Sequence, residues 1–251
     1  MIDKAVIVTG ASSGLGAHIT RHLVAEGARV VAGARRVDRL QALARDLAAA
    51  PGRLIVMEAD VTRAEDAERL VAAAVEAFGG LDALVNNAGM EVQGSIEVLA
   101  EADLEAMLRT NVVGPFLCTR AALPYLKVKG GSVVNLGSTV VPRAPRNRFG
   151  YVGTKGAIEA MSRALAGDLG PHNIRVNVVR PGIVPSEFRG LTEEEEARTL
   201  GERVPRIQAL PAVGKGMDVA AAVAFLISDG AAWITGALLD VDGGYALGVW
   251  R

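Results

Sequence analysis

The alternation of short apolar runs with longer segments of helical periodicity is the feature that most constrains this fold. A strand, a helix and a second strand normally join through a right-handed crossover that leaves the two strands parallel. Repeats of this unit build a parallel sheet with helices on both faces, and its doubly covered strands are almost wholly apolar. The expected fold class is therefore α/β, a Rossmann-type doubly wound parallel sheet. The expected strands are residues 5–8, 29–32, 54–57, 81–85, 132–136, 174–179 and 238–241, and the clearest helices are 14–26, 103–126, 151–169 and 217–228.

Two further helices are predicted from their capping signals. Asp38 is expected to cap a helix that buries Leu40, Leu43 and Leu47. Thr62 and Glu65 have the spacing of a capping box. The helix behind that box should end at the pair Gly79-Gly80.

Composition narrows the class of protein. The 251 residues suit a single domain over residues 1–251, and a formal net charge of -1 gives no basic field for nucleic acid or an anionic membrane. The apolar run 219–227 is less than half of a membrane span of about 20 residues. The single cysteine, Cys118, excludes an internal disulfide framework. With no signal-peptide pattern, we expect a cytoplasmic protein whose partner is a small molecule.

One stretch interrupts the alternation. Residues 181–211 contain four prolines, the acidic run 193–196 and only one weak helical segment. A long irregular stretch inside a compact domain is typical of a functional loop. We expect a substrate loop, or lid, at about residues 185–211, anchored by apolar residues such as Phe188, Leu191 and Leu200.

The first expected strand runs into a glycine-rich loop that opens a helix. The spacing is Gly10-x-x-x-Gly14-x-Gly16, with Ser12, Ser13 and Leu15 between the glycines. Glycines let the backbone approach a diphosphate, and the helix N-terminus supplies free N–H groups and a positive dipole end. This context favours a dinucleotide site.

Two alternatives overlap the same region. Gly10-x-Ser12-x-Gly14 also matches the nucleophile elbow of a serine hydrolase, for which His172 is the available histidine. His18 and His22 are four residues apart and could share a metal, but no third ligand is apparent. We therefore expect no metal site.

The end of the second expected strand bears on the choice of dinucleotide. An acidic residue there usually holds the ribose 2′-hydroxyl of NAD. This chain has Ala34, Arg35 and Arg36 instead, and a guanidinium can pair with a 2′-phosphate. Asp38 could accept the hydroxyl, although it is better placed as a helix cap. NADP(H) is favoured, and NAD(H) is possible.

A catalytic pair is expected at the start of the helix 151–169. Tyr151 and Lys155 are four residues apart, so their side chains emerge on the same helix face. A lysine cation near a phenol favours the phenolate and lowers its pKa from about 10. Ser138 follows a strand, at the edge where parallel sheets bind ligands.

Taken in order, these motifs resemble the single-domain branch of the short-chain dehydrogenase/reductase family over nearly the whole chain. The resemblance rests on the set and its spacing, because each motif is weak alone. The matching residues are Thr9-Gly10-x-x-x-Gly14-x-Gly16, Asp60-Val61, Asn86-Asn87-Ala88-Gly89, Asn111, Ser138, Tyr151-x-x-x-Lys155, Arg180-Pro181-Gly182, Thr235-Gly236 and Asp242-Gly243-Gly244.

The resemblance implies a role for each matching residue. Tyr151 would exchange a proton with the carbonyl oxygen, Lys155 would hold the nicotinamide ribose, and Ser138 would orient the carbonyl. Asn111 would sit in a helix and hold a water that relays protons from Lys155. The remaining implied roles are adenine contacts by Asp60 and Val61, a cofactor groove lined by Asn87 and Ala88, sheet stabilisation by Asn86, nicotinamide contacts by Ile183 and Ser186, and further cofactor contacts by Gly89, Pro181 and Gly182.

Several alternatives stay open at this stage. The resemblance implies a carbonyl reductase or alcohol dehydrogenase, commonly a homotetramer, whereas an NADP(H)-binding sensor would not need the acid/base pair. Dehydration or epimerisation of the substrate is a further possibility. Arg143, Arg146 and Arg148 could read an anionic substrate or simply face solvent. The apolar tail 245–251 is expected to pack on a neighbouring subunit.

Overall fold

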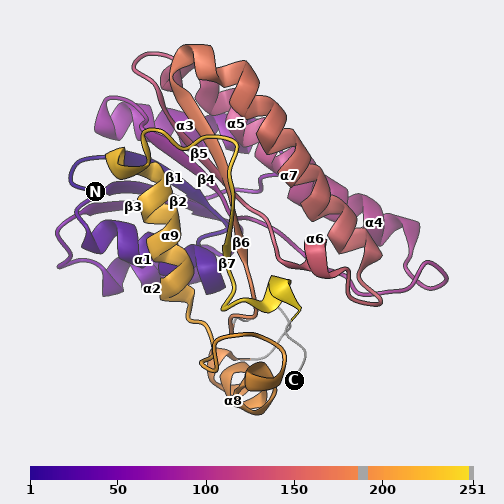
Figure 1. Cartoon of the computed structure of the whole chain (residues 1–251). Coiled ribbons are helices and arrows are strands. Elements are labelled where there is room, and N and C mark those ends of the chain that lie inside the picture. Colours follow the sequence, from indigo (N-terminus) through magenta and orange to yellow (C-terminus); the bar gives the residue numbers. More distant parts are fainter. Residues whose placement is uncertain (186–191, 249–251) are drawn as a thin grey trace.

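The computed structural model describes residues 1–185 and 192–248, and its strands form one parallel sheet (Figure 1). The strand order is β3-β2-β1-β4-β5-β6-β7, and every neighbouring pair is parallel. The order reverses between β1 and β4, which leaves a crevice at the carboxyl ends of these strands. The strands are β1 (Ala5–Thr9), β2 (Arg29–Ala34), β3 (Arg53–Glu58), β4 (Ala83–Asn86), β5 (Gly131–Leu136), β6 (Ile174–Pro181) and β7 (Leu238–Val241).

Helices cover both faces of the sheet because successive strand residues point to opposite sides. In β1, Val6 and Val8 pack in one core with α1, α2 and α9, whereas Ala5 and Ile7 pack in a second core with α3, α5 and α7 (Figure 1). The expected doubly wound α/β fold is confirmed. The helices are α1 (Gly14–Ala25), α2 (Val37–Asp46), α3 (Ala64–Phe78), α4 (Glu101–Leu108), α5 (Gly114–Leu126), α6 (Val140–Arg143), α7 (Phe149–Leu169), α8 (Glu193–Arg203) and α9 (Gly216–Ile227). No helix in residues 1–185 or 192–248 has the length and apolar character to cross a membrane.

Both predicted N-terminal caps are wrong. The capping position of α2 is Arg36, so Asp38 lies in the first turn, where its charge still favours the helix dipole. The Thr62 backbone N–H and hydroxyl both donate to Asp60 Oδ1, which leaves Arg63 as the capping residue of α3. The C-terminal prediction is confirmed, because Gly79 ends α3 with a φ of 77°.

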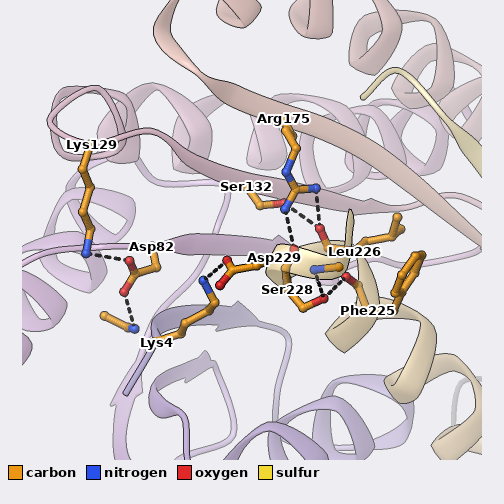
Figure 2. Close-up of polar contacts among 11 residues, drawn as sticks. Lys4, Asp82, Lys129, Ser132, Arg175, Phe225, Leu226, Ser228 and Asp229 are labelled. Carbon is orange, nitrogen blue, oxygen red and sulfur yellow. Dashed lines mark hydrogen bonds and ion pairs between the residues drawn. The ribbon is translucent and has the colours of Figure 1, made fainter. Parts of the chain in front are cut away.

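The amino-terminal edge of the sheet is closed by polar contacts (Figure 2). Asp82 accepts hydrogen bonds from the Ala5 backbone N–H at 2.7 Å and pairs with Lys129 Nζ at 2.7 Å. The Arg175 guanidinium donates to the carbonyl oxygens of Leu226 at 2.6 Å and Ser228 at 3.2 Å, which end α9. These contacts satisfy backbone groups at that edge, so the open crevice lies at the opposite, carboxyl-terminal edge.

Candidate active site

A cleft of about 670 Å³ lies at the carboxyl ends of the strands. Its size is in the range of small-molecule and cofactor pockets. Asn111 lies just behind the lining, and Ser186 lies outside the described residues. The other predicted site residues all line the cleft: Gly10, Ser12, Ser13, Gly14, Leu15, Gly16, Ala34, Arg35, Arg36, Asp60, Val61, Asn87, Ala88, Gly89, Ser138, Tyr151, Lys155, Pro181, Gly182 and Ile183.

The glycine-rich loop is packed too tightly for side chains at its first and last glycines. Gly10 has a φ of +67°, and a Cβ there would lie 2.7 Å from Ala88 Cα. A Cβ on Gly16 would lie 2.3 Å from the Gly10 carbonyl oxygen. Asn87 Nδ2 donates to the carbonyl oxygens of Thr9 at 2.9 Å and Gly10 at 3.1 Å. The loops after β1 and β4 are therefore fixed to each other at the floor of the cleft.

The N-terminus of α1 faces this cleft and fits a diphosphate. Ser13 is the capping residue, but its side chain makes no capping hydrogen bond, and the first turn carries no acidic residue. The helix dipole and its first N–H groups are therefore uncompensated there. Arg36 donates from Nε to Ser12 Oγ at 3.2 Å and also bonds Ser13 Oγ, which brings a positive charge beside the loop. This end of the cleft therefore suits an anionic group.

Arg35 follows the last residue of β2 directly and lines the same cleft. It also lines an adjoining hollow of mixed charge, whose other lining residues are Glu58, Asp60, Arg63, Glu65, Asp66 and Arg69. Within residues 1–185 and 192–248, the Arg35 guanidinium makes no hydrogen bond or ion pair, unlike that of Arg36. An exposed guanidinium without a partner at this position is available to a ligand.

Tyr151 and Lys155 share one face of α7, as their spacing predicts. Both are buried, and Lys155 Nζ lies 5.7 Å from the centroid of the Tyr151 ring. Lys155 Nζ donates to the Leu136 carbonyl oxygen at 2.7 Å, where β5 ends. Burial lowers the pKa of Lys155 to about 8, and the nearby Glu159 carboxylate opposes this shift. Ser138 follows β5 and is half-buried, and its Oγ accepts from the Val140 N–H at 3.3 Å.

Asn111 lies in a π-helical turn, Arg109–Val113, that joins α4 to α5. Its Nδ2 donates to the Met90 carbonyl oxygen at 2.8 Å and to Thr154 Oγ1 at 3.0 Å, and its Oδ1 accepts from the Met90 N–H at 2.8 Å. The side chain therefore ties α7 to the loop after β4, and the relay water stays a prediction. Asn86 links β4 to β5 as expected, because its Nδ2 donates to Asn135 Oδ1 at 2.8 Å.

The outer end of the cleft contains residues that come from distant parts of the chain. Arg146 and Arg148 line it, but Arg148 Nε lies 3.0 Å from Glu91 Oε1 in a buried ion pair. Arg143 does not line the cleft, and its guanidinium lies 4.7 Å from the centroid of the Tyr245 ring. The three arginines Arg143, Arg146 and Arg148, here called the arginine rim, therefore bring less net positive charge to the cleft than expected.

Leu200 of α8, which was expected only as an apolar anchor of the lid, and Tyr245, which was expected to pack on a neighbouring subunit, both line the cleft. Tyr245 packs against Arg143 of its own chain, and the expected packing of the tail on a neighbouring subunit stays a prediction. Phe188, Leu191 and residues 249–251 lie outside the described residues. No local signal marks Leu200 or Tyr245, since their positions depend on how distant segments pack.

The serine hydrolase alternative does not fit the topology. Ser12 follows β1 at the carboxyl-terminal edge of the sheet. His172 precedes β6 and therefore lies at the opposite edge. A histidine there cannot take a proton from Ser12 Oγ.

Comparisons with known proteins agree with this geometry. A family described as enoyl-(acyl carrier protein) reductase matches residues 10–246. An uncharacterized oxidoreductase of Methylorubrum extorquens is 40% identical, with 96% of this chain and 97% of that protein covered. L-rhamnose 1-dehydrogenase (NAD(P)(+)) of Azotobacter vinelandii is 37% identical, with 97% of each chain covered. The solved structure of a short-chain type dehydrogenase/reductase from Mycobacterium ulcerans has a TM-score of 0.93 at 29% identity, with 100% of this chain and 92% of that chain covered.

Proposed function

Because the chain belongs to the short-chain dehydrogenase/reductase family, we propose that it interconverts a carbonyl compound and an alcohol with NADP(H) as its preferred cofactor. The observation that carries the proposal is the meeting of Ser138, Tyr151 and Lys155 in the same cleft as the α1 N-terminus. A protein that only sensed the nucleotide would have no need of an acid/base pair. The intact set therefore favours catalysis over sensing.

The proposed chemistry assigns one task to each side chain. A nicotinamide bound in this cleft would supply the hydride that the carbonyl carbon accepts. The Ser138 hydroxyl orients the carbonyl and donates to its oxygen as negative charge develops there. The Tyr151 hydroxyl gives its proton to that oxygen, and the Lys155 ammonium stabilises the phenolate that remains. In alcohol oxidation Tyr151 takes the proton back.

NADP(H) is proposed over NAD(H) because of the residues that follow β2. Arg35 is exposed, lines the cleft and has no partner among the described residues. Asp38 lies in the first turn of α2 and does not line the cleft. A 2′-phosphate would pair with Arg35, whereas the two residues that directly follow β2, Arg35 and Arg36, offer no carboxylate to a 2′-hydroxyl.

The proposed substrate is uncharged. The Glu91 carboxylate neutralises Arg148, so Arg146 is the remaining cleft cation at that end among the described residues. Val140 and Val184 add apolar surface beside it. A panel of carbonyl compounds with NADPH consumption as readout tests the function. Failure to consume NADPH with any of them, and to reduce NADP⁺ with the matching alcohols, would count against it and favour sensing, dehydration or epimerisation.

The reduction rates of matched keto acids and keto esters should show whether the arginine rim recognises a negatively charged substrate. We expect the ester to be reduced at least as fast as the acid, because one buried ion pair already balances Arg148. Arg146→Ala is the matched variant and should change the ratio of the two rates little. A faster acid whose advantage disappears in Arg146→Ala and at raised salt would show that the rim reads charge.

The substrate lid is also proposed, on the described part of α8. Its Thr192 and Glu195 form a capping box, and Leu200 reaches the cleft wall. We expect the amides of residues 197–201 to exchange more slowly when NADPH and substrate are bound, because the ligand gives Leu200 an additional contact. Amide hydrogen exchange measures this, with α3 as the internal control. Equally slow exchange in the unliganded protein would contradict a lid.

A homotetramer is proposed as well, with the outer faces of α4, α5 and α7 as its interface. Leu108, Phe116 and Phe149 are exposed apolar side chains on these helices. Exposed apolar side chains that gather on one face often mark a subunit interface.

A further inference from the structure

A buried carboxylate lies beside the proposed catalytic lysine and has no part in the mechanism above. Glu159 follows Lys155 by one turn of α7, so the two side chains share a helix face. Its side chain is 9% exposed. Glu159 Oε1 is buried and has no hydrogen-bond partner within the described residues. A buried carboxylate oxygen without a donor is costly and calls for a reason.

Both charged groups lie near the end of β5. Lys155 Nζ donates to the carbonyl oxygen of Leu136 at 2.7 Å. A Cβ on the next residue, Gly137, would lie 3.4 Å from Glu159 Oε1. The two charged groups therefore face consecutive residues at the end of β5, directly before Ser138. A Cβ on Gly137 would also lie 2.6 Å from Val178 Cγ1, so the end of β5 packs closely against its neighbours here.

An anchored arginine holds the other oxygen of Glu159. Arg180 Nη1 lies 3.6 Å from Glu159 Oε2. The same guanidinium donates from Nη2 to Asp240 Oδ2 at 2.8 Å and from Nε to Asp240 Oδ1. Arg180 and Asp240 are register partners in β6 and β7, so the strand pairing fixes these two hydrogen bonds. The Glu159 carboxylate is thereby held through its Oε2 atom.

The charged groups that act on Glu159 are few. They are Arg180 from β6, Asp240 from β7 and Lys155 from its own helix. Burial raises the pKa of the Glu159 carboxyl, Arg180 opposes that shift, Asp240 adds to it, and Lys155 opposes it. In return, Glu159 raises the pKa of Lys155 against the lowering caused by burial.

We propose that Glu159 is a positioning residue whose charge keeps the buried Lys155 side chain protonated, held for this purpose by the Arg180–Asp240 pair. Taking an ammonium out of water favours its neutral form, and an adjacent carboxylate favours the charged form. A neutral Lys155 could no longer stabilise the Tyr151 phenolate. The role of Lys155 rests on the proposed function, but the link between Glu159 and Lys155 does not.

The test is a titration of Tyr151 by phenolate absorbance, without substrate or cofactor. The chain has three tyrosines, so a Tyr125→Phe/Tyr245→Phe background leaves Tyr151 as the reporter. In Glu159→Gln we expect the phenolate to form at a pH about one unit higher, because Lys155 loses its proton first. Glu159→Asp keeps the charge and should shift less. Asp168→Asn removes an exposed carboxylate from the same helix and should shift nothing.

A purely structural Glu159 would give a different result. An unchanged Tyr151 titration in a folded Glu159→Gln protein would overturn the proposal. If that variant does not fold, Glu159→Leu/Arg180→Met removes the ion pair as a unit, and the same shift is required of it. Once a carbonyl substrate is known, the high-pH limb of kcat/KM for reduction, where Lys155 loses its proton, should move down by about one pH unit in Glu159→Gln. A protein without turnover would argue against the proposed function, while the titration would still decide the role of Glu159.

Discussion

Tyr151→Phe is expected to lower kcat by about a hundredfold or more, the usual contribution of general acid–base catalysis. The change removes one hydroxyl and keeps the ring, which packs with Met107 and Val140 in a small core. The fold and the affinity for NADPH should therefore survive. Steady-state kinetics measures the loss, and the fluorescence of bound NADPH measures the retained affinity.

Tyr125→Phe is the matched control for this experiment. Tyr125 lies on α5 with 38% of its surface exposed and does not line the cleft. The same chemical change there should leave kcat close to its original value. If Tyr151→Phe also kept most of its kcat, the proton would have to come from another group, and the proposed mechanism would be wrong.

Arg35→Ala should have the second largest effect, and it should be confined to one cofactor. We expect kcat/KM for NADPH to fall. The loss should correspond to about 1.5–3 kcal/mol of transition-state binding free energy, which is the scale of a hydrogen bond to a charged group. Arg35 is exposed and has no protein partner among the described residues, so its removal should leave the fold intact. The value for NADH should change little, because NADH lacks the 2′-phosphate.

Two other arginines test whether the effect belongs to this position. Arg45→Ala removes an exposed guanidinium at the far end of α2 and should alter neither cofactor. Arg36→Ala should weaken both cofactors, because Arg36 bonds the two serines of the glycine-rich loop. Equal losses with NADPH and NADH in Arg35→Ala would contradict the assignment of the 2′-phosphate to Arg35.

The sequence predicted the architecture and most of the cleft because these features are encoded locally. Alternating apolar runs mark the strands, and the carboxyl ends of parallel strands meet at one edge. The loop Gly10–Gly16, Ser138 and the pair Tyr151 and Lys155 therefore had to lie near one another once the sheet formed. Helix caps were less predictable. The Thr62 hydroxyl, which a capping box would need, instead donates a hydrogen bond to Asp60.

Only the tertiary structure decided which charges meet. Arg148 pairs with Glu91, and Arg180 joins Glu159 to Asp240, across separations that no local spacing describes. Leu200 and Tyr245 reach the cleft from segments far along the chain. The physical reason is that periodicity reports how a residue lies within its own helix or strand, whereas ion pairs depend on strand register and on how elements pack. The sequence thus determined the fold and the set of proposed catalytic residues, and the packing of distant elements decided the charges around them.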